Sequence, residues 1–162
     1  MDAPGEGIAG IGRYNHAGKS TFYVSNSQDC AVSEIVKDPS VQSIAWVQKY
    51  KVKDIGDILD LTMDWNEFYN LKSVLFVTLL NRRVFEQKAG TAYSTWKPEY
   101  LLTNFLSDCA KNAGYQGIRY TSVKGYDFNV VFFDRSKLNI IPKGIPELVT
   151  VKGEPKRTVV DF

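Results

Sequence analysis

The strongest constraint on the fold comes from the segment "KPEYLLTNFLSDCAKNAG" and the two apolar segments that follow it. Pro98 and Glu99 suit the first turn of a helix, and Gly114 suits its end. "GIRYTS" and "FNVVFFD" predict two strands joined by the turn "VKGYD". The helix should bury an apolar stripe at helical spacing, made of Leu101, Leu102, Phe105, Leu106, Cys109, Ala110 and Ala113.

The N-terminal part of the chain predicts strands around a short helix. "GRYN" is expected to enter a short strand, and "HAGKS" to turn at Gly18. "TFYVS" alternates and consists mainly of β-branched or aromatic residues, which predicts a strand. "NSQDCAVSEIV" then predicts a helix capped by Asn26 or Ser27.

The middle and the end of the chain add further strands and one helix. "VQSIAWVQKYKV" predicts a strand, and "DIGDILDLT" another with a possible bulge at Gly56. Residues 64–86 predict a helix, and "EQKAGTAYSTW" a loop. "LNIIP" and "ELVTV" predict two short strands. Strands thus bracket two or three helices without regular β–α alternation, which favours an α+β fold with a mostly antiparallel sheet and packed helices.

The length of 162 residues fits one ordinary domain. We expect a flexible lead-in over residues 1–10, a single domain over 11–152 and a polar tail over 153–162. With 20 basic and 18 acidic residues the net charge is +2. The sequence therefore lacks the strong positive charge that is typical of proteins that bind nucleic acids or membrane surfaces directly. The longest apolar window, "VLFVTLL", is far shorter than a membrane span needs.

The soft metal ligands are few. His16 is the sole histidine of the sequence, and the two cysteines, Cys30 and Cys109, fall on separate predicted helices. We therefore expect two buried free thiols in a reducing compartment, no metal site and no metal requirement. A cytoplasmic enzyme or binding domain remains.

Two distant segments carry residues that suit a common pocket. The stretch "GRYNHAGKSTFYVSNSQDCAVSEI" places Arg13, Asn15, Tyr23 and Glu34 along one short path, and these types suit an anionic ligand with an aromatic portion. Ser122 ends the strand of "GIRYTS", and Asn129 begins the next. We expect one cleft to be lined by Arg13, Tyr23, Glu34, Ser122 and Asn129.

Taken together, the two segments resemble the RES family, named for its Arg, Glu and Ser. The matching pieces are "GRYNHAG", "FYVS", "AVSEI", "YLLTNFLSDCAKNAGYQGIRYTS" and "NVVFF", in that order over roughly residues 11–135. The resemblance implies a fold similar to ADP-ribosyltransferases and cleavage of NAD between nicotinamide and ribose. It also implies a bacterial toxin that is held by an antitoxin, often of the Xre type, or by an immunity protein. NAD is then a substrate, and no cofactor is expected.

The resemblance also assigns roles, which the residue chemistry supports. Glu34 would stabilise the positive charge that develops on the ribose, because nicotinamide leaves as a neutral molecule. Arg13 would hold the pyrophosphate and Tyr23 would stack on nicotinamide or ribose. Ser122 would hydrogen-bond the ribose or the nicotinamide amide, and Asn129 would support the same pocket. The alternatives are a solvated glutamate, a surface arginine, a core tyrosine, a turn serine and a structural asparagine.

Other functions stay open at this point. The acceptor of the ADP-ribosyl group could be water, phosphate or a protein side chain, the last making the chain an ADP-ribosyltransferase that modifies a host protein. A degenerate, non-catalytic binding module of the same fold is the third alternative. Twelve residues precede Arg13 and none is Arg, whereas family members usually carry an upstream arginine; this feature favours the binding module. The expected location is the cytoplasm, reached directly or as the terminal domain of a secreted effector.

Overall fold

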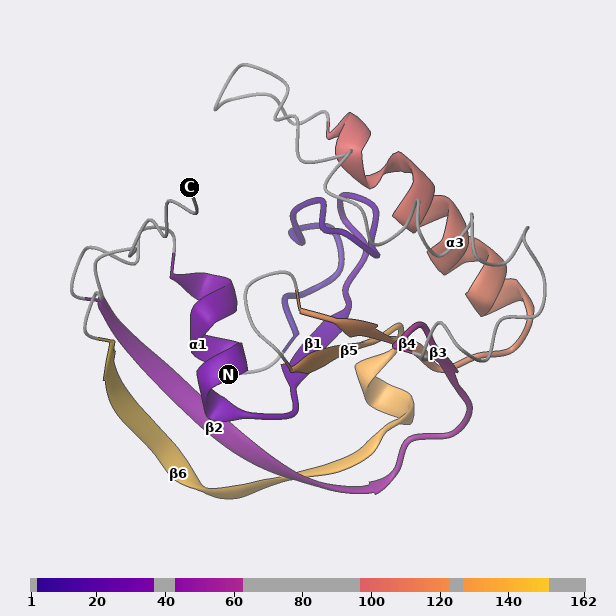
Figure 1. Ribbon diagram of the computed structural model, residues 1–162. Coiled ribbons are helices and arrows are strands. Elements are labelled where there is room, and N and C mark those ends of the chain that lie inside the picture. The colour runs from indigo at the N-terminus through magenta and orange to yellow at the C-terminus, as the bar shows by residue number, and fades with distance from the viewer. Residues whose placement is uncertain (1–2, 37–42, 63–96, 123–126, 152–162) are drawn as a thin grey trace, which may run out of the picture.

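The computed structural model describes residues 3–36, 43–62, 97–122 and 127–151, and it shows an α+β arrangement, as the sequence predicts (Figure 1). Two helices and six strands are described. Their bounds are β1 Phe22–Ser25, α1 Gln28–Ile35, β2 Ser43–Asp54, β3 Ile58–Asp60, α3 Leu101–Asn112, β4 Gly117–Thr121, β5 Phe128–Phe132 and β6 Asn139–Val151, with short 3-10 helices at Pro98–Tyr100 and Arg135–Lys137.

The strands form two sheets. The larger sheet has the order β1-β5-β4-β3, in which β1–β5 and β4–β5 are antiparallel and β3–β4 is parallel. The second sheet is a long antiparallel ribbon of β2 and β6 that sweeps past the larger one in Figure 1. The mostly antiparallel character predicted from the sequence is therefore confirmed.

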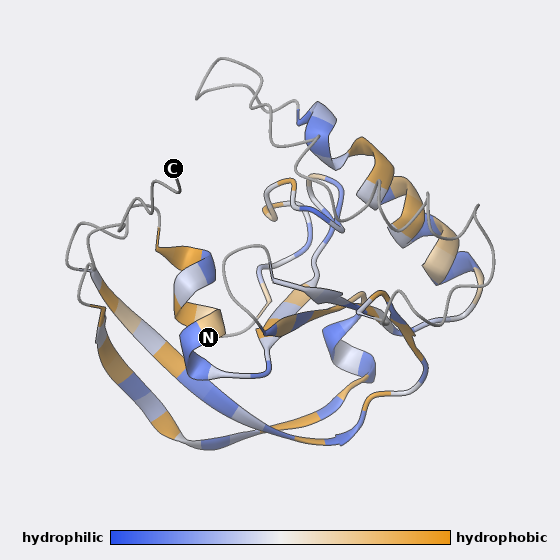
Figure 2. Ribbon diagram, in the orientation of Figure 1, coloured by the Kyte–Doolittle hydropathy of each residue, from blue (hydrophilic) through white to orange (hydrophobic). Residues whose placement is uncertain are grey.

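Each face of the larger sheet buries its own apolar cluster. On one face, Ile118 and Val131 pack with Leu106 and Ala110 of α3 and with Tyr14. On the other face the cluster joins the sheet to the chain that leads into and along β6; its buried members are Phe22, Phe132, Leu138 and Ile140. Bands of opposite hydropathy alternate along β2 and β6 (Figure 2), although apolar residues of the ribbon such as Ile44 and Leu148 are more than half exposed. The sheet thus lies between α3 and the β2–β6 ribbon.

Three local predictions are corrected by the structure. "GRYN" forms no strand but a turn, in which the Gly12 amide donates to the Asn15 carbonyl at 3.0 Å. Gly56 lies in the link between β2 and β3, not in a bulge, with a φ of 61°. "LNIIP" and "ELVTV" are parts of one strand, β6, because Gly144 adopts a φ of 72° where the register with β2 shifts and the chain continues beyond it.

Helix α3 is present as predicted, but its buried face differs from the predicted one. Leu101 and Phe105 are 73% and 63% exposed, and Cys109 is also exposed, so the expectation of two buried thiols holds for Cys30 alone. The buried face instead includes the polar side chains of Thr103 and Ser107, whose hydroxyls donate to the carbonyls of Tyr100 at 3.1 Å and Tyr14 at 2.8 Å. These hydrogen bonds offset the cost of burying the two hydroxyls.

Two further predictions, the helix over 64–86 and the loop "EQKAGTAYSTW", lie outside the described residues. Among the helices that are described, none is both long enough and apolar enough to cross a membrane.

Candidate functional site

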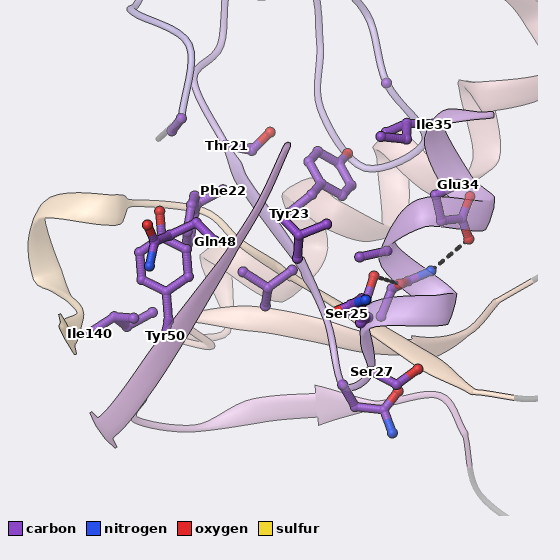
Figure 3. A pocket seen from close by; sticks show the side chains of 18 of the residues that line it. Thr21, Phe22, Tyr23, Ser25, Ser27, Glu34, Ile35, Gln48, Tyr50 and Ile140 are labelled. Carbon is purple, nitrogen blue, oxygen red and sulfur yellow. Dashed lines mark hydrogen bonds between the residues drawn. The ribbon is translucent and has the colours of Figure 1, made fainter. Parts of the chain in front are cut away.

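A pocket of about 810 Å³ runs along the edge strand β1, between helix α1 and strand β2 (Figure 3). Its size falls within the range of small-molecule sites, roughly 300–1,000 Å³. The polar lining includes Arg13, Tyr23, Ser25, Glu34, Tyr120 and Asn129, and the apolar lining includes Phe22, Val24, Trp46, Tyr50, Val52 and Ile140. Charged, amide, hydroxyl and aromatic groups therefore face one space.

Glu34 lies in the last turn of α1, and its carboxylate accepts hydrogen bonds from two residues that lie 88 and 95 positions further along the chain. The helix starts at Ser27, whose hydroxyl accepts from the Cys30 amide at 3.2 Å, as the capping prediction required. One carboxylate oxygen of Glu34, Oε1, accepts from the Ser122 hydroxyl and from Asn129 Nδ2, each at 2.8 Å. The predicted meeting of the two distant segments is thus seen in the structure.

Ser122 differs from the other predicted site residues in its position. It is 4% exposed and does not line the pocket, whereas Arg13, Tyr23, Glu34 and Asn129 do. Its hydroxyl donates a hydrogen bond to the Glu34 carboxylate. The expectation that five residues line one cleft is therefore correct for four, and a direct contact of Ser122 with a ligand stays a prediction.

Asn129 is placed by the register of three strands. It lies opposite Ser25 in the β1–β5 pair and opposite Tyr120 in the β4–β5 pair. Residues opposite each other on paired strands point to the same face, so these three side chains form one row across the sheet. Asn129 Oδ1 accepts from the Ser25 hydroxyl at 2.5 Å and from Cys30 Sγ at 3.3 Å.

Asp127 links the start of α1 to the segment that leads into β5 by hydrogen bonds. Its carboxylate accepts from the Ser27 hydroxyl and from Asn26 Nδ2, the latter at 2.8 Å. These two hydrogen bonds, that from Ser27 first, hold the pKa of Asp127 below its usual value. The same helix that presents Glu34 is thereby anchored at its opposite end.

Arg13 lies on the turn of residues 12–15, beside an aromatic ring. Its guanidinium carbon is 5.6 Å from the centre of the Tyr120 ring, within the distance of a cation–π contact. Buried Asn15 stabilises the turn, because its Nδ2 donates to the carbonyls of Gly10 at 2.8 Å and His16 at 3.1 Å. The loop therefore holds a cation at the pocket wall.

Tyr23 has two separate tasks in the structure. Its hydroxyl accepts from the Tyr14 amide at 3.1 Å and donates to Asn15 Oδ1 at 2.9 Å, which ties β1 to the Arg13 loop. Its ring, with the residue 39% exposed, faces the pocket. The hydroxyl is supporting the loop while the ring can still take part in the predicted stacking on a ligand.

The sequence interpretation did not assign three residues that the structure places in this site. Asn15 is named beside Arg13 in the sequence but has no assigned contact there, and Ser25 and Tyr120 have no assigned role. Their signal is the strand register, since Ser25 and Tyr120 both pair with Asn129. The register of β1 with β5 depends on how segments about a hundred residues apart align, so the alternation within one strand could not reveal the Ser25–Asn129 pair.

Two buried tyrosines, Tyr14 and Tyr120, and the partly exposed Tyr23 predict a stability that falls at alkaline pH. Burial raises the pKa values of Tyr14, Tyr23 and Tyr120 above the ordinary 10.0. The unfolded chain loses these protons near pH 10 while the folded chain keeps them, so the stabilisation is complete below about pH 10 and is lost as the pH rises further. We expect the free energy of unfolding in urea to decrease above about pH 10, and to do so less steeply in Tyr23→Phe. Equal slopes in the two proteins would contradict this prediction.

Other candidate residues lie away from the pocket lining. His16 Nε2 is 2.8 Å from Asp108 on α3, and both side chains are about half exposed. The guanidinium carbon of Arg119 lies 3.8 Å from the centre of the Phe128 ring, and a guanidinium nitrogen of Arg119 lies 3.2 Å from a carboxylate oxygen of Asp60. In the part of the chain that the structure describes, no three His, Cys, Asp or Glu side chains group as metal ligands, and the absence of a metal requirement stays a prediction.

Comparison with known proteins adds one match. A model of the RES domain matches residues 1–148 of the chain. No curated protein matches, and no solved structure matches.

Proposed function

The chain belongs to the RES domain family, and from this membership we propose that it binds NAD in the pocket beside β1 and breaks the bond between nicotinamide and ribose. The family as a whole supports a toxin-like function, an NAD-related enzymatic activity and an association with antitoxins. The specific reaction, the identity of NAD as substrate and an antitoxin or immunity protein as partner belong to the proposal. The expected substrate pool is cytoplasmic NAD.

The observation that carries the proposal is the Glu34 carboxylate, fixed by Ser122 and Asn129 at the wall of a pocket large enough for a dinucleotide. As the glycosidic bond lengthens, positive charge develops on the ribose. A carboxylate already held in place can stabilise that charge without having to reorganise. Nicotinamide departs neutral, so no strong acid is required to protonate it.

The remaining groups fit the anionic and aromatic parts of the ligand. The Arg13 guanidinium can make paired hydrogen bonds to pyrophosphate oxygens. The Tyr23 ring offers a stacking surface on the same side of the sheet as Asn129 and Ser25. In this proposal Ser122 and Asn129 act on the substrate through Glu34, whose carboxylate they orient.

The direct test follows the products of NAD. Purified protein is incubated with NAD, with and without phosphate, while free nicotinamide and the ribose-containing product are measured. Release of nicotinamide supports the proposal, and the second product identifies water or phosphate as acceptor. ADP-ribose found on an added protein extract would indicate the transferase instead. NAD that binds without nicotinamide release would indicate a binding module and overturn the proposal.

Replacing Arg13 with alanine should weaken substrate binding more than it slows the chemical step. The pyrophosphate carries the same charge in the ground state and the transition state, so its contact stabilises both about equally. We expect KM for NAD to rise roughly ten- to hundredfold, the range for a hydrogen bond to a charged group, with kcat within about twofold. Lys19→Ala removes an exposed cation six residues along the chain and serves as control. A fall in kcat at unchanged KM would argue against this role.

A further inference from the structure

The side-chain amide of Asn129 lies between three groups whose chemistry fixes its orientation. A carboxylate can accept hydrogen bonds but, when ionised, cannot donate one, so the amide nitrogen must face Glu34 Oε1, 2.8 Å away. The amide oxygen then faces the Ser25 hydroxyl and the Cys30 thiol, at 2.5 Å and 3.3 Å. Figure 3 shows Ser25 and Glu34 joined to this network by dashed lines.

We propose that Ser25 is a positioning residue for the Glu34 carboxylate and acts through the amide of Asn129. The inference rests on the proposed NAD cleavage, in which Glu34 is the group that stabilises the ribose. Ser25 donates to the oxygen of the amide, and the nitrogen of the same amide donates to Glu34. The hydroxyl on β1 thereby selects the amide orientation that holds the carboxylate on α1.

The two groups that donate to Asn129 Oδ1 differ in hydrogen-bond strength. A hydroxyl is a full hydrogen-bond donor, whereas a thiol is a weak one, and the Cys30 contact is the longer of the two. Asn129 is 3% exposed, so solvent has little access to replace a missing donor. Without the Ser25 hydroxyl, the amide oxygen keeps only the weak thiol, and rotation of the amide by half a turn costs less. Each such rotation removes the hydrogen bond from Asn129 Nδ2 to Glu34 Oε1.

The kinetic test compares two substitutions of one residue. Ser25→Ala removes the donor, and Ser25→Thr keeps a hydroxyl on a side chain that suits a strand. We expect Ser25→Ala to lower kcat for NAD cleavage about three- to tenfold at unchanged KM, the scale of one neutral hydrogen bond, and Ser25→Thr to restore most of the loss. Ser33→Ala removes another hydroxyl near α1 that donates to the Cys30 carbonyl at 2.8 Å, and it should leave kcat unchanged.

A double substitution separates positioning from a general loss of packing. In protein that already carries Glu34→Gln, Ser25→Ala should have little further effect on kcat, because the carboxylate through which it acts is gone. A merely structural role predicts the same fold-loss in both backgrounds. Equal losses, or a Ser25→Thr variant no better than Ser25→Ala, would overturn the proposal.

A measurement on the protein alone keeps this inference separate from the proposed function. The two Hδ2 signals of Asn129 in an NMR spectrum, assigned by their loss in Asn129→Ser, report how the amide is held. We expect a single protected pair in the wild-type protein, and doubled signals or faster exchange with water in Ser25→Ala. If nicotinamide is never released, the proposed function fails while this readout still tests the amide. Unchanged signals in Ser25→Ala would overturn the positioning role whatever the activity.

Discussion

Glu34→Gln is expected to lower the rate of NAD cleavage by at least about a hundredfold, on the order of 3 kcal/mol of transition-state stabilisation. Glutamine keeps an acceptor oxygen that can receive the hydrogen bonds from Ser122 and Asn129, so the shape of the site should persist. What disappears is the negative charge that would face the ribose. Because that charge matters only as the bond breaks, NAD affinity should change little.

The measurement pairs single-turnover nicotinamide release with calorimetric titration of NAD. Glu147→Gln is the matched control: it removes a carboxylate that pairs with Lys49 at 3.0 Å on the β2–β6 ribbon, where about half of each side chain is exposed. We expect the control to keep the wild-type rate. In cells, the wild-type protein should deplete NAD and arrest growth, and Glu34→Gln should be tolerated. Full turnover and full toxicity of Glu34→Gln would leave the carboxylate only a structural role, that of joining α1 to Ser122 and Asn129.

Gly12→Ala is expected to raise KM for NAD about tenfold or more and to destabilise the fold by about 1–3 kcal/mol, the usual cost of overpacking. A Cβ at this position would come within 2.3 Å of Asn15 Oδ1 and 3.0 Å of the Tyr23 hydroxyl. Neither group can move away cheaply, because Asn15 is buried and bonded to several carbonyls and Tyr23 is bonded to the Tyr14 amide. The loop must therefore shift, and Arg13 shifts with it.

Gly10→Ala gives the comparison for this prediction, since a Cβ at Gly10 meets no atom within 4 Å. Both variants add the same methyl group to the same loop region, so the difference between them isolates the steric contact at Gly12. Urea unfolding and NAD kinetics measure the two effects. If Gly12→Ala binds NAD as tightly as Gly10→Ala does, the Arg13 loop tolerates displacement and its proposed contact with the ligand is wrong.

The parts of the fold that depend on local chemistry were predictable from the sequence. Ser27 caps α1 because its hydroxyl reaches the Cys30 amide within one turn. Strands were predicted at "TFYVS" and "FNVVFFD", and β1 and β5 formed there. The ordered match to the RES family predicted the family, which comparison confirms.

The parts that depend on long-range contacts were not predictable in the same way. The apolar spacing of α3 predicted Leu101 and Phe105 inward, yet both are exposed, whereas Ser107 is buried and donates to the Tyr14 carbonyl. The turn at "GRYN" forms because Asn15 satisfies carbonyls on both sides of it. Tertiary packing determines which groups become hydrogen-bond partners, and the sequence of a single segment does not reveal it.

The pairing of β1 with β5 has a consequence for when the activity can arise during synthesis. Ser25 and Asn129 are 104 residues apart in sequence, and Glu34 and Ser122 are 88 apart. Bringing such distant segments together closes a long loop, so these contacts form only after most of the chain is available. A nascent chain that has already exposed Glu34 still lacks the donors Ser122 and Asn129. The hydrogen bonds that hold this carboxylate therefore form only after residues 122 and 129 have left the ribosome.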